Sequence, residues 1–272
     1  RGAMTSNNTS LWGFVTQYGP KMNGLGVRGN NIKMATANYM NFYGMANGLP
    51  LTDDASKFDP EHPFKGRDPR FYHDVLFDGV KYLNKALEKG HADYDFRYCT
   101  LSSGGKMRDV VEGSRTGYFI HKLVPHTANK HDLAYTDAQA FQSYVAYMRL
   151  ADIYLMYAEV MLKLNSADVA TEYVNKVRRR AWGESNYDVP GTKGEDFTTV
   201  TMEILQEERY KELFFENTRW YDICRWGILE QELAKYPSTN AGTVHYDPQD
   251  YYLPIPESEM RSNPLMKQSK GY

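Results

Sequence analysis

The sequence lacks the features that mark several large classes of protein. Its 272 residues contain two cysteines, Cys99 and Cys224, too few for a disulfide framework or a cysteine metal cluster. Apolar runs are short, so no segment is expected to span a bilayer. The net charge of −2 excludes the basic surface of a nucleic-acid-binding protein, and no nucleic-acid partner is expected. The start, RGAMTSNNTS, has no secretory signal.

Common catalytic motifs are also missing. The sequence contains no nucleophile elbow, Walker loop or familiar cysteine–histidine pattern. Residues 24–29, GLGVRG, match the glycine spacing of a dinucleotide-binding loop. That motif requires a buried strand before it and a helix after it, whereas polar loop sequence flanks these glycines. We therefore interpret residues 24–29 as a glycine-rich loop and expect no nucleotide cofactor.

The sequence predicts no metal ligands. His121, His126 and His131 are spaced by five, which does not place them on one helix face, and no Cys or Glu completes the set. The aspartates within 53–54 and 93–95 do not form a complete calcium loop. No cofactor is expected, although a structural calcium ion stays open.

Helical periodicity begins at about residue 141. The apolar positions of the first helix fall on one face, at Leu150, Ile153, Tyr154, Tyr157, Met161 and Leu164. A turn at 165–166 and a stop at Gly183 bound a second helix, and further helices are expected near 199–215 and 217–235. The pattern favours two tetratricopeptide-type hairpins. About three repeats are normally needed for stability, so two hairpins leave apolar faces to be covered.

The remainder of the chain contains many turn-forming residues. Residues 1–140 are expected to be loop-rich, with few short strands and one short helix within 36–46. The stretch 47–70 carries four prolines and is expected to be irregular. Residues 236–272 are broken by prolines and are expected to form an extended tail. The predicted fold is therefore mainly α, with helical hairpins at 141–235 beside a large loop-rich region.

Residues 208–227, ERYKELFFENTRWYDICRWG, alternate charged and aromatic side chains. The acidic residues of this stretch include Glu208, Glu212 and Glu216, which are one helical turn apart. Glycoside hydrolysis would need two carboxyls in a cleft, one of them with a raised pKa. The interleaved arginines and lysine would instead keep the carboxylates ionised. We interpret the stretch as structural ion pairs, with Glu216–Arg219 and Asp222–Arg225 at helical spacing.

Six segments, in this order, resemble the SusD/RagB family of outer-membrane nutrient-binding lipoproteins. They are KGRDPRFY at 65–72, TGYFIHK at 116–122, YMRLADIYLMYAEV at 147–160, VNKVRRRA at 174–181, the 208–227 stretch, and LPIPESEMRSNPLMKQSKGY at 253–272. The resemblance covers about residues 36–272. Members are typically longer, so it implies that this chain is a C-terminal portion and that Arg1 is not the biological start.

The resemblance implies binding rather than catalysis. Such proteins sit on the extracellular face of the outer membrane, lipid-anchored through an N-terminal segment that this chain would lack. They bind oligosaccharides or polysaccharides, or peptides in some members, and act as a lid on a SusC-like TonB-dependent transporter. A glycoside hydrolase and a tetratricopeptide scaffold for another protein are the competing interpretations. The resemblance does not identify the sugar.

The ligand residues are expected in the N-terminal loops. Ligand aromatics of the family lie in variable loops, which on the resemblance nominates Trp12 and Tyr18, with Tyr43 a weaker third. Aromatic rings beside amide-rich loops suit sugars, which present apolar C–H faces and polar edges. Truncating a stacked ring such as Trp12 should weaken binding by at least about 1 kcal/mol. No catalytic residue is expected.

Overall fold

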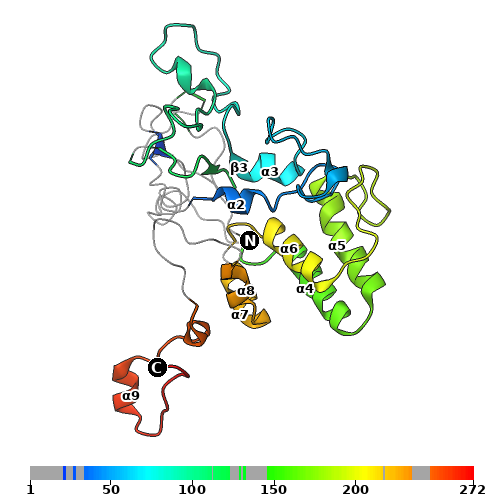
Figure 1. Ribbon diagram of the computed structural model, residues 1–272, viewed down its shortest axis with the longest axis vertical. Helices are drawn as coiled ribbons and strands as arrows, with labels where there is room; N and C mark the ends of the chain where they lie inside the picture. The colour runs from blue at the N-terminus through cyan, green and yellow to red at the C-terminus, as the bar shows by residue number, and fades with distance from the viewer. Residues whose placement is uncertain are drawn as a thin grey trace. The chain divides into compact units, whose positions relative to one another are not determined.

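The structure is a computed structural model that contains two compact units. One comprises Arg1–Glu212 and the other comprises Leu213–Tyr272. The residues that the structure describes are 21–22, 27–28, 34–111, 113–122, 129, 131–132, 146–216, 218–234 and 246–272. Figure 1 shows their helices and strands.

The described part of the chain is mostly helical with few short strands, as the sequence predicts. The first unit contains β1 (Lys21–Met22), β2 (Val27–Arg28), α2 (Ala37–Met40), η2 (Asp54–Ser56), α3 (Pro69–Asp74), β3 (Val75–Leu76), η3 (Tyr94–Arg97), β4 (Phe119–Ile120), α4 (Leu150–Lys163), α5 (Ala167–Ala181) and α6 (Met202–Glu212). The second contains α7 (Arg219–Trp226), α8 (Leu229–Ala234), η4 (Pro248–Tyr251) and α9 (Glu257–Ser262). Strands β1 and β2 pair antiparallel, as do β3 and β4. Among the described residues, no helix combines the length and apolarity needed to cross a membrane.

Helices α4 and α5 form the predicted hairpin, and α6 packs beside α4 (Figure 1). Their shared core consists of Ala151, Leu155, Ala158, Ala170, Val174, Val177, Val200 and Leu205. Asn165 makes the turn with a φ of 60°, a left-handed conformation that asparagine tolerates. Helix α5 ends where expected, since Gly183 follows it with a φ of 74°. The tetratricopeptide-type geometry of this hairpin stays a prediction.

The apolar face that the sequence pattern marks on α4 is largely exposed within the described structure. Leu150, Ile153, Tyr157 and Leu164 are 59%, 45%, 40% and 64% exposed. The buried face carries Leu155 and the small alanines of the shared core instead. Tyr154 and Met161 of that face do pack against the shared core, so the helical periodicity is right and the predicted face is buried only in part. Helix α4 is apolar on two sides, and the small side chains are the ones that let another helix approach closely. An open apolar face agrees with the expectation for so few hairpins.

Two further elements differ from the sequence prediction. Helix α3 begins inside the stretch expected to be irregular, because the Asp68 carboxylate accepts a hydrogen bond from the Arg70 amide and Pro69 occupies the first helical position. The predicted fourth helix is two helices. Gly227, with a φ of 68°, ends α7, and α8 starts at Leu229. The proline-broken tail contains short helices η4 and α9 rather than extended chain alone.

A second core lies in the loop-rich region. It consists of Leu76, Leu83, Cys99, Leu101, Met107 and Phe119. Backbone hydrogen bonds join residues 79–83 to residues 97–99, including Cys99 N–H to the Val80 carbonyl at 2.8 Å and Tyr82 N–H to the Arg97 carbonyl at 2.8 Å. These bonds fix the backbone on either side of Tyr98 although the region has little regular secondary structure.

Candidate functional site

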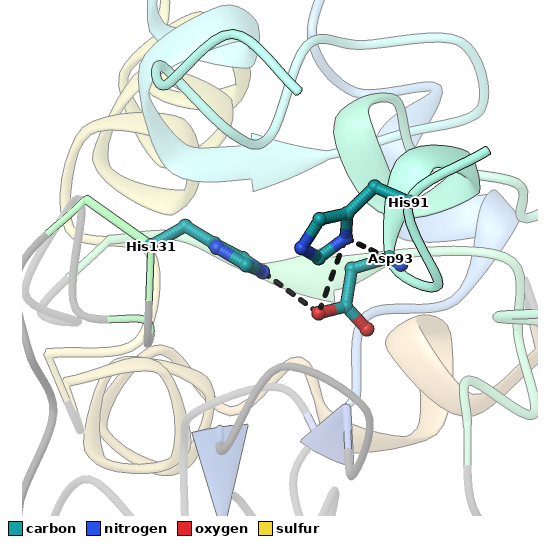
Figure 2. Close-up of side chains that lie close together, drawn as sticks. All are labelled: His91, Asp93 and His131. Atoms are coloured by element: carbon teal, nitrogen blue, oxygen red, sulfur yellow. Dashed lines mark hydrogen bonds and ion pairs between the residues drawn. The ribbon is translucent and has the colours of Figure 1, made fainter. Parts of the chain in front are cut away.

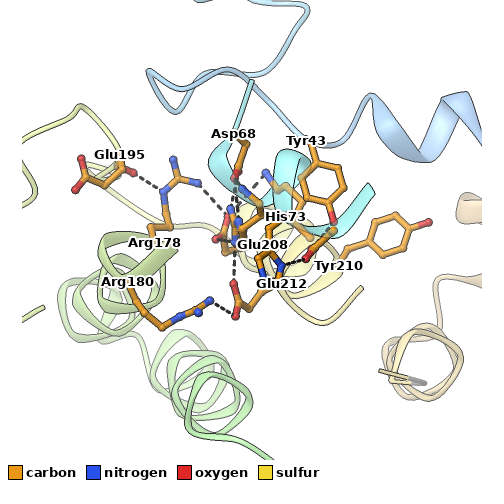
Figure 3. A network of polar contacts seen from close by, with 12 residues as sticks. Tyr43, Asp68, His73, Arg178, Arg180, Glu195, Glu208, Tyr210 and Glu212 are labelled. Atoms are coloured by element: carbon orange, nitrogen blue, oxygen red, sulfur yellow. Dashed lines mark hydrogen bonds and ion pairs between the residues drawn. The ribbon is translucent and has the colours of Figure 1, made fainter. Parts of the chain in front are cut away.

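Glu208 and Glu212 of the 208–227 stretch enter a buried ionic network that Figure 3 shows from close by. Its central cation is Arg70 on α3, whose side chain is 7% exposed. The Arg70 guanidinium donates to Asp68 Oδ2 at 2.7 Å and to Glu208 Oε1 at 2.7 Å. The same nitrogen that binds Glu208 also binds Glu212 Oε2 at 3.1 Å. One arginine therefore ties α3 to two consecutive turns of α6.

Glu208 has no exposed surface and accepts hydrogen bonds on both carboxylate oxygens. Arg178 of α5 donates to Oε2 at 3.0 Å, and Lys211 lies 3.8 Å from the same oxygen. Burial alone would raise the pKa of Glu208, but the nearby charges of Arg70, Arg178 and Lys211 outweigh burial and hold this pKa well below its usual range. Glu208 is therefore ionised at neutral pH in the folded protein.

Glu212 anchors the other end of the network. Its Oε1 accepts hydrogen bonds from Arg149 Nη1 at 2.5 Å and from Arg180 Nη2 at 2.6 Å. Its backbone carbonyl accepts from Lys122 Nζ at 2.9 Å. These donors come from the start of α4, the end of α5 and the segment after β4. A single glutamate thus fixes three elements against α6.

The geometry confirms that Glu208 and Glu212 make structural ion pairs. A general acid needs a carboxyl that is protonated at the working pH, and Glu208 is held ionised by its cations. In the second unit, the expected pair Asp222–Arg225 forms at 2.8 Å, and Arg219 pairs with Glu232 at 2.5 Å.

The two cysteines offer no activated nucleophile. Burial raises the pKa of Cys99 to about 12, and burial also raises the pKa of Cys224. Nucleophilic attack requires the thiolate, which a raised pKa disfavours. Cys99 instead packs in the core of the loop-rich region.

The three nominated ligand residues have different outcomes. Trp12 and Tyr18 lie outside the described residues and stay predictions. Tyr43 is 0% exposed, and its hydroxyl donates to Asp74 Oδ2 at 3.0 Å. Burial, and then the Asp74 charge, raise the pKa of Tyr43 well above its usual value. A ring without exposed surface has no face to stack on a sugar, so Tyr43 has the position of a core residue.

Replacing Tyr43 with phenylalanine is expected to lower the free energy of unfolding by about 1.5–3 kcal/mol, because it removes a buried hydrogen bond to a charged group. Denaturant unfolding measures the loss. The matched control is Tyr98→Phe. Tyr98 is 47% exposed, and the hydrogen bond to Asp74 is made by Tyr43. A Tyr43→Phe variant as stable as the wild type would contradict the core assignment.

The structure adds a partly exposed aromatic surface, with Tyr98 as its exposed ring, that sequence reasoning missed. The Arg97 guanidinium lies 3.3 Å from the Tyr94 ring centroid and 5.7 Å from that of Tyr98. Arg97 Nε also donates to the Tyr94 carbonyl at 2.8 Å, which fixes the guanidinium over the ring. The signal available in the sequence was the run YDFRYC at 94–99, where an arginine stands between two tyrosines. We call Tyr94, Arg97 and Tyr98 the tyrosine–arginine surface.

Comparison with known proteins identifies relatives over nearly all of this chain. A sequence model of the SusD family matches residues 2–272. SusD-like protein P25 of Formosa agariphila is 38% identical over 128 residues, which cover 44% of this chain and 23% of that protein. The starch-binding protein SusD of Bacteroides thetaiotaomicron is 22% identical over 229 residues, covering 83% of this chain and 36% of that protein.

Solved structures agree on the fold. A SusD-like protein of Bacteroides fragilis superposes with a TM-score of 0.71 at 23% identity, covering 99% of this chain and 53% of that chain. A SusD-like carbohydrate binding protein of the same species gives a TM-score of 0.58 at 23% identity, covering 88% of this chain and 49% of that chain. The chain thus spans about half the length of these structures and a smaller share of the two curated relatives above.

Proposed function

Since the chain belongs to the SusD family, we propose that this protein is the glycan-binding component of a nutrient importer. SusD-like proteins bind carbohydrates and are not catalysts. The family match across residues 2–272 is the observation that carries the proposal. Its ligand is an oligosaccharide or polysaccharide, captured reversibly. Dissociation constants from micromolar to millimolar, about 4–8 kcal/mol of binding free energy, would suit capture followed by release.

The buried ionic network supports binding over hydrolysis. The carboxylates that invited a glycosidase interpretation are occupied by Arg70, Arg178 and Arg149, and Glu208 is held ionised. In the proposed role, the chain acts as a lid on a SusC-like TonB-dependent transporter at the extracellular face of the outer membrane. A lipid anchor would hold it there. The family resemblance supports the partner, the location and the anchor.

Stacking rings are the proposed ligand contacts. Trp12 and Tyr18 are retained from the sequence analysis, and Tyr98 is added because its ring is 47% exposed on a fixed backbone beside Arg97. Tyrosine and tryptophan rings stack on the apolar faces of sugars, and a cation above a neighbouring ring holds the surface in place. Tyr43 is not carried forward, since its ring is buried.

Substituting alanine for Trp12 or Tyr98 should weaken glycan binding by at least about 1 kcal/mol, or roughly fivefold in Kd, since a stacked aromatic contributes that much or more. Affinity electrophoresis in gels containing soluble polysaccharides measures the change. Starch is the first to use, because one relative is a starch-binding protein. Isothermal titration with the polysaccharide that retards the protein then gives Kd.

Tyr187→Ala is the matched control, because Tyr187 is 42% exposed in a different loop of the same unit. Unchanged affinity in both Trp12→Ala and Tyr98→Ala would refute the proposal that these two rings contact the glycan. Binding of peptides and of no glycan would favour the peptide-binding alternative. Release of reducing ends from a glycan by the purified protein would favour a hydrolase.

A further inference from the structure

Two histidines and an aspartate from separate parts of the sequence meet in the loop-rich region. The ligand atoms offered by His91, Asp93 and His131 all lie within 4.8 Å of one another. His131 Nε2 is 2.8 Å from Asp93 Oδ2, and His91 Nδ1 is 4.0 Å from the same oxygen. Figure 2 shows both imidazole rings next to the same oxygen of the Asp93 carboxylate. Their centroids are 5.3 Å apart, with the planes at 78°.

The three groups have the chemistry of a transition-metal site. Imidazole nitrogen and carboxylate oxygen are ligands of zinc, and two histidines with one carboxylate leave a fourth position for water. Tetrahedral zinc with bonds of about 2.0–2.1 Å places its ligand atoms roughly 3.3 Å apart. The separations of 2.8 and 4.0 Å lie on either side of that value. Small side-chain movements would therefore bring the atoms to coordination distance.

The protonation pattern of the group also suits a metal. The backbone N–H of Asp93 donates to His91 Nδ1 at 3.0 Å, so this nitrogen carries no proton and its one lone pair accepts that hydrogen bond. Between His131 Nε2 and Asp93 Oδ2 a single proton is shared. A divalent cation can replace that proton at His131 Nε2, and it would take the His91 Nδ1 lone pair in exchange for the Asp93 N–H hydrogen bond. Asp93 is only 7% exposed, so the carboxylate is already largely desolvated.

Surrounding hydrogen bonds hold the ligands in place. The buried amide of Asn129 accepts the backbone N–H of His131 at 3.0 Å and donates to Asp132 Oδ2 at 2.9 Å. The Asp132 carboxylate in turn accepts the backbone N–H groups of Asn84 and Lys85 at 3.0 and 2.7 Å. Asn129, His131 and Asp132 are thereby tied to the segment before η3. A metal site needs such outer contacts to orient its ligands.

We propose that His91, Asp93 and His131 bind one divalent metal ion of the zinc type, which clamps His131 and its neighbours Asn129 and Asp132 to the loop that leads into η3. In the sequence, the histidines grouped with His131 were His121 and His126, whose spacing argued against a site. The partners that the structure supplies lie 38 and 40 residues upstream of it. In this proposal the ion holds the two loops together whichever glycan the protein binds.

The test is a titration of the chelator-treated, tag-free chain with zinc chloride, followed by isothermal calorimetry. One zinc ion per chain is expected to bind, and His131→Gln and His91→Gln should each weaken binding at least about tenfold, the lower end of what losing even an outer-contact residue costs. Zinc should also raise the melting temperature of the wild type and not that of His131→Gln. Circular dichroism checks that both variants fold.

The matched control is His62→Gln. His62 Nδ1 lies 2.8 Å from Asp59 Oδ2, so this pair reproduces one histidine–aspartate contact in an exposed setting apart from the cluster. Its substitution should leave zinc binding unchanged. The proposal is overturned if the wild type binds no zinc, if His131→Gln and His91→Gln bind it as tightly as the wild type, or if His62→Gln weakens binding equally. Cobalt substitution gives an independent readout, since tetrahedral coordination would appear in its visible spectrum.

Discussion

Replacing Glu208 with glutamine is expected to lower the free energy of unfolding by about 3–5 kcal/mol, the range for breaking a buried ion pair by removing one partner. The glutamate has no exposed surface and lies between Arg70 and Arg178, both of which are buried. Glutamine fills nearly the same volume, so the loss comes from charge and not from a cavity. Two guanidiniums would then share a site without the anion that compensates them. Urea or guanidinium unfolding measures the effect.

Glu207→Gln is the control for this prediction. Glu207 is the adjacent residue on α6 and is exposed, so its substitution removes the same charge from the same helix. Surface substitutions of this kind usually change stability by no more than about 0.5 kcal/mol. If Glu208→Gln were as mild as Glu207→Gln, the ionic network would not be what joins α3, α5 and α6.

The same carboxylate predicts a pH dependence. Its pKa is depressed in the folded state from the usual 4.5, so its contribution to stability is complete above about pH 4.5 and is lost as the pH falls below that value. Wild-type stability should therefore decline toward acid by up to about 1.4 kcal/mol per pH unit from this group. Glu208→Gln lacks the titrating group, so the difference in the free energy of unfolding between the wild type and this variant should become smaller below pH 4.5. A stability difference that becomes larger in acid would contradict the depressed pKa of Glu208.

Replacing Arg67 with methionine is expected to cost at least about 3 kcal/mol, because it removes the hydrogen bonds that a buried guanidinium donates to four backbone carbonyls, and hydrogen bonds to charged groups contribute about 1.5–3 kcal/mol each. Arg67 is 3% exposed, and its guanidinium donates to the backbone carbonyls of Met40, Tyr43, Gly44 and Pro63. It also lies 4.7 Å from the Phe71 ring centroid. Methionine keeps the packing of the stem and removes every donor. Thermal and denaturant unfolding measure the loss.

The control for Arg67 is Lys65→Met, a nearby exposed cation whose loss should be almost neutral. Arg67→Lys provides a graded variant, since an ammonium retains donors but lacks the planar fork that reaches several carbonyls at once. It should fall between the wild type and Arg67→Met. Equal stability of all three would show that the carbonyls find other partners.

Local physics in the sequence was enough for the main helices. Apolar spacing of 3.6 residues placed α4 and α5, and the ending at Gly183 followed from the freedom of glycine at positive φ. Alternating charges correctly indicated that Glu208 and Glu212 form ion pairs and are not a catalytic pair. The start of α3 was readable as well, since Asp68 followed by Pro69 is a typical cap and first residue, but the many prolines nearby obscured it.

The tertiary structure decided which residues form ion pairs with one another and which face of α4 is buried. No local pattern indicates that Glu208 meets Arg70, which is 138 residues away, because ion pairing depends on where helices pack. The face of α4 that becomes buried is likewise set by its neighbours α5 and α6, which select small side chains on a helix that is apolar on two sides. The sequence nominated Tyr43 as a ligand residue. In the structure its hydroxyl donates a hydrogen bond to Asp74 in the protein core.

The sequence by itself determined the family, the helical hairpin of α4 and α5 and the structural role of the charged stretch at 208–227. Each of these depends on residues close together along the chain, or on a series of motifs in order. Only the tertiary structure decided that Arg70 is the centre of the network, that Tyr43 is buried, and that His91, Asp93 and His131 converge. These outcomes depend on contacts between distant segments, whose geometry is fixed when the chain packs and is not encoded in any local spacing.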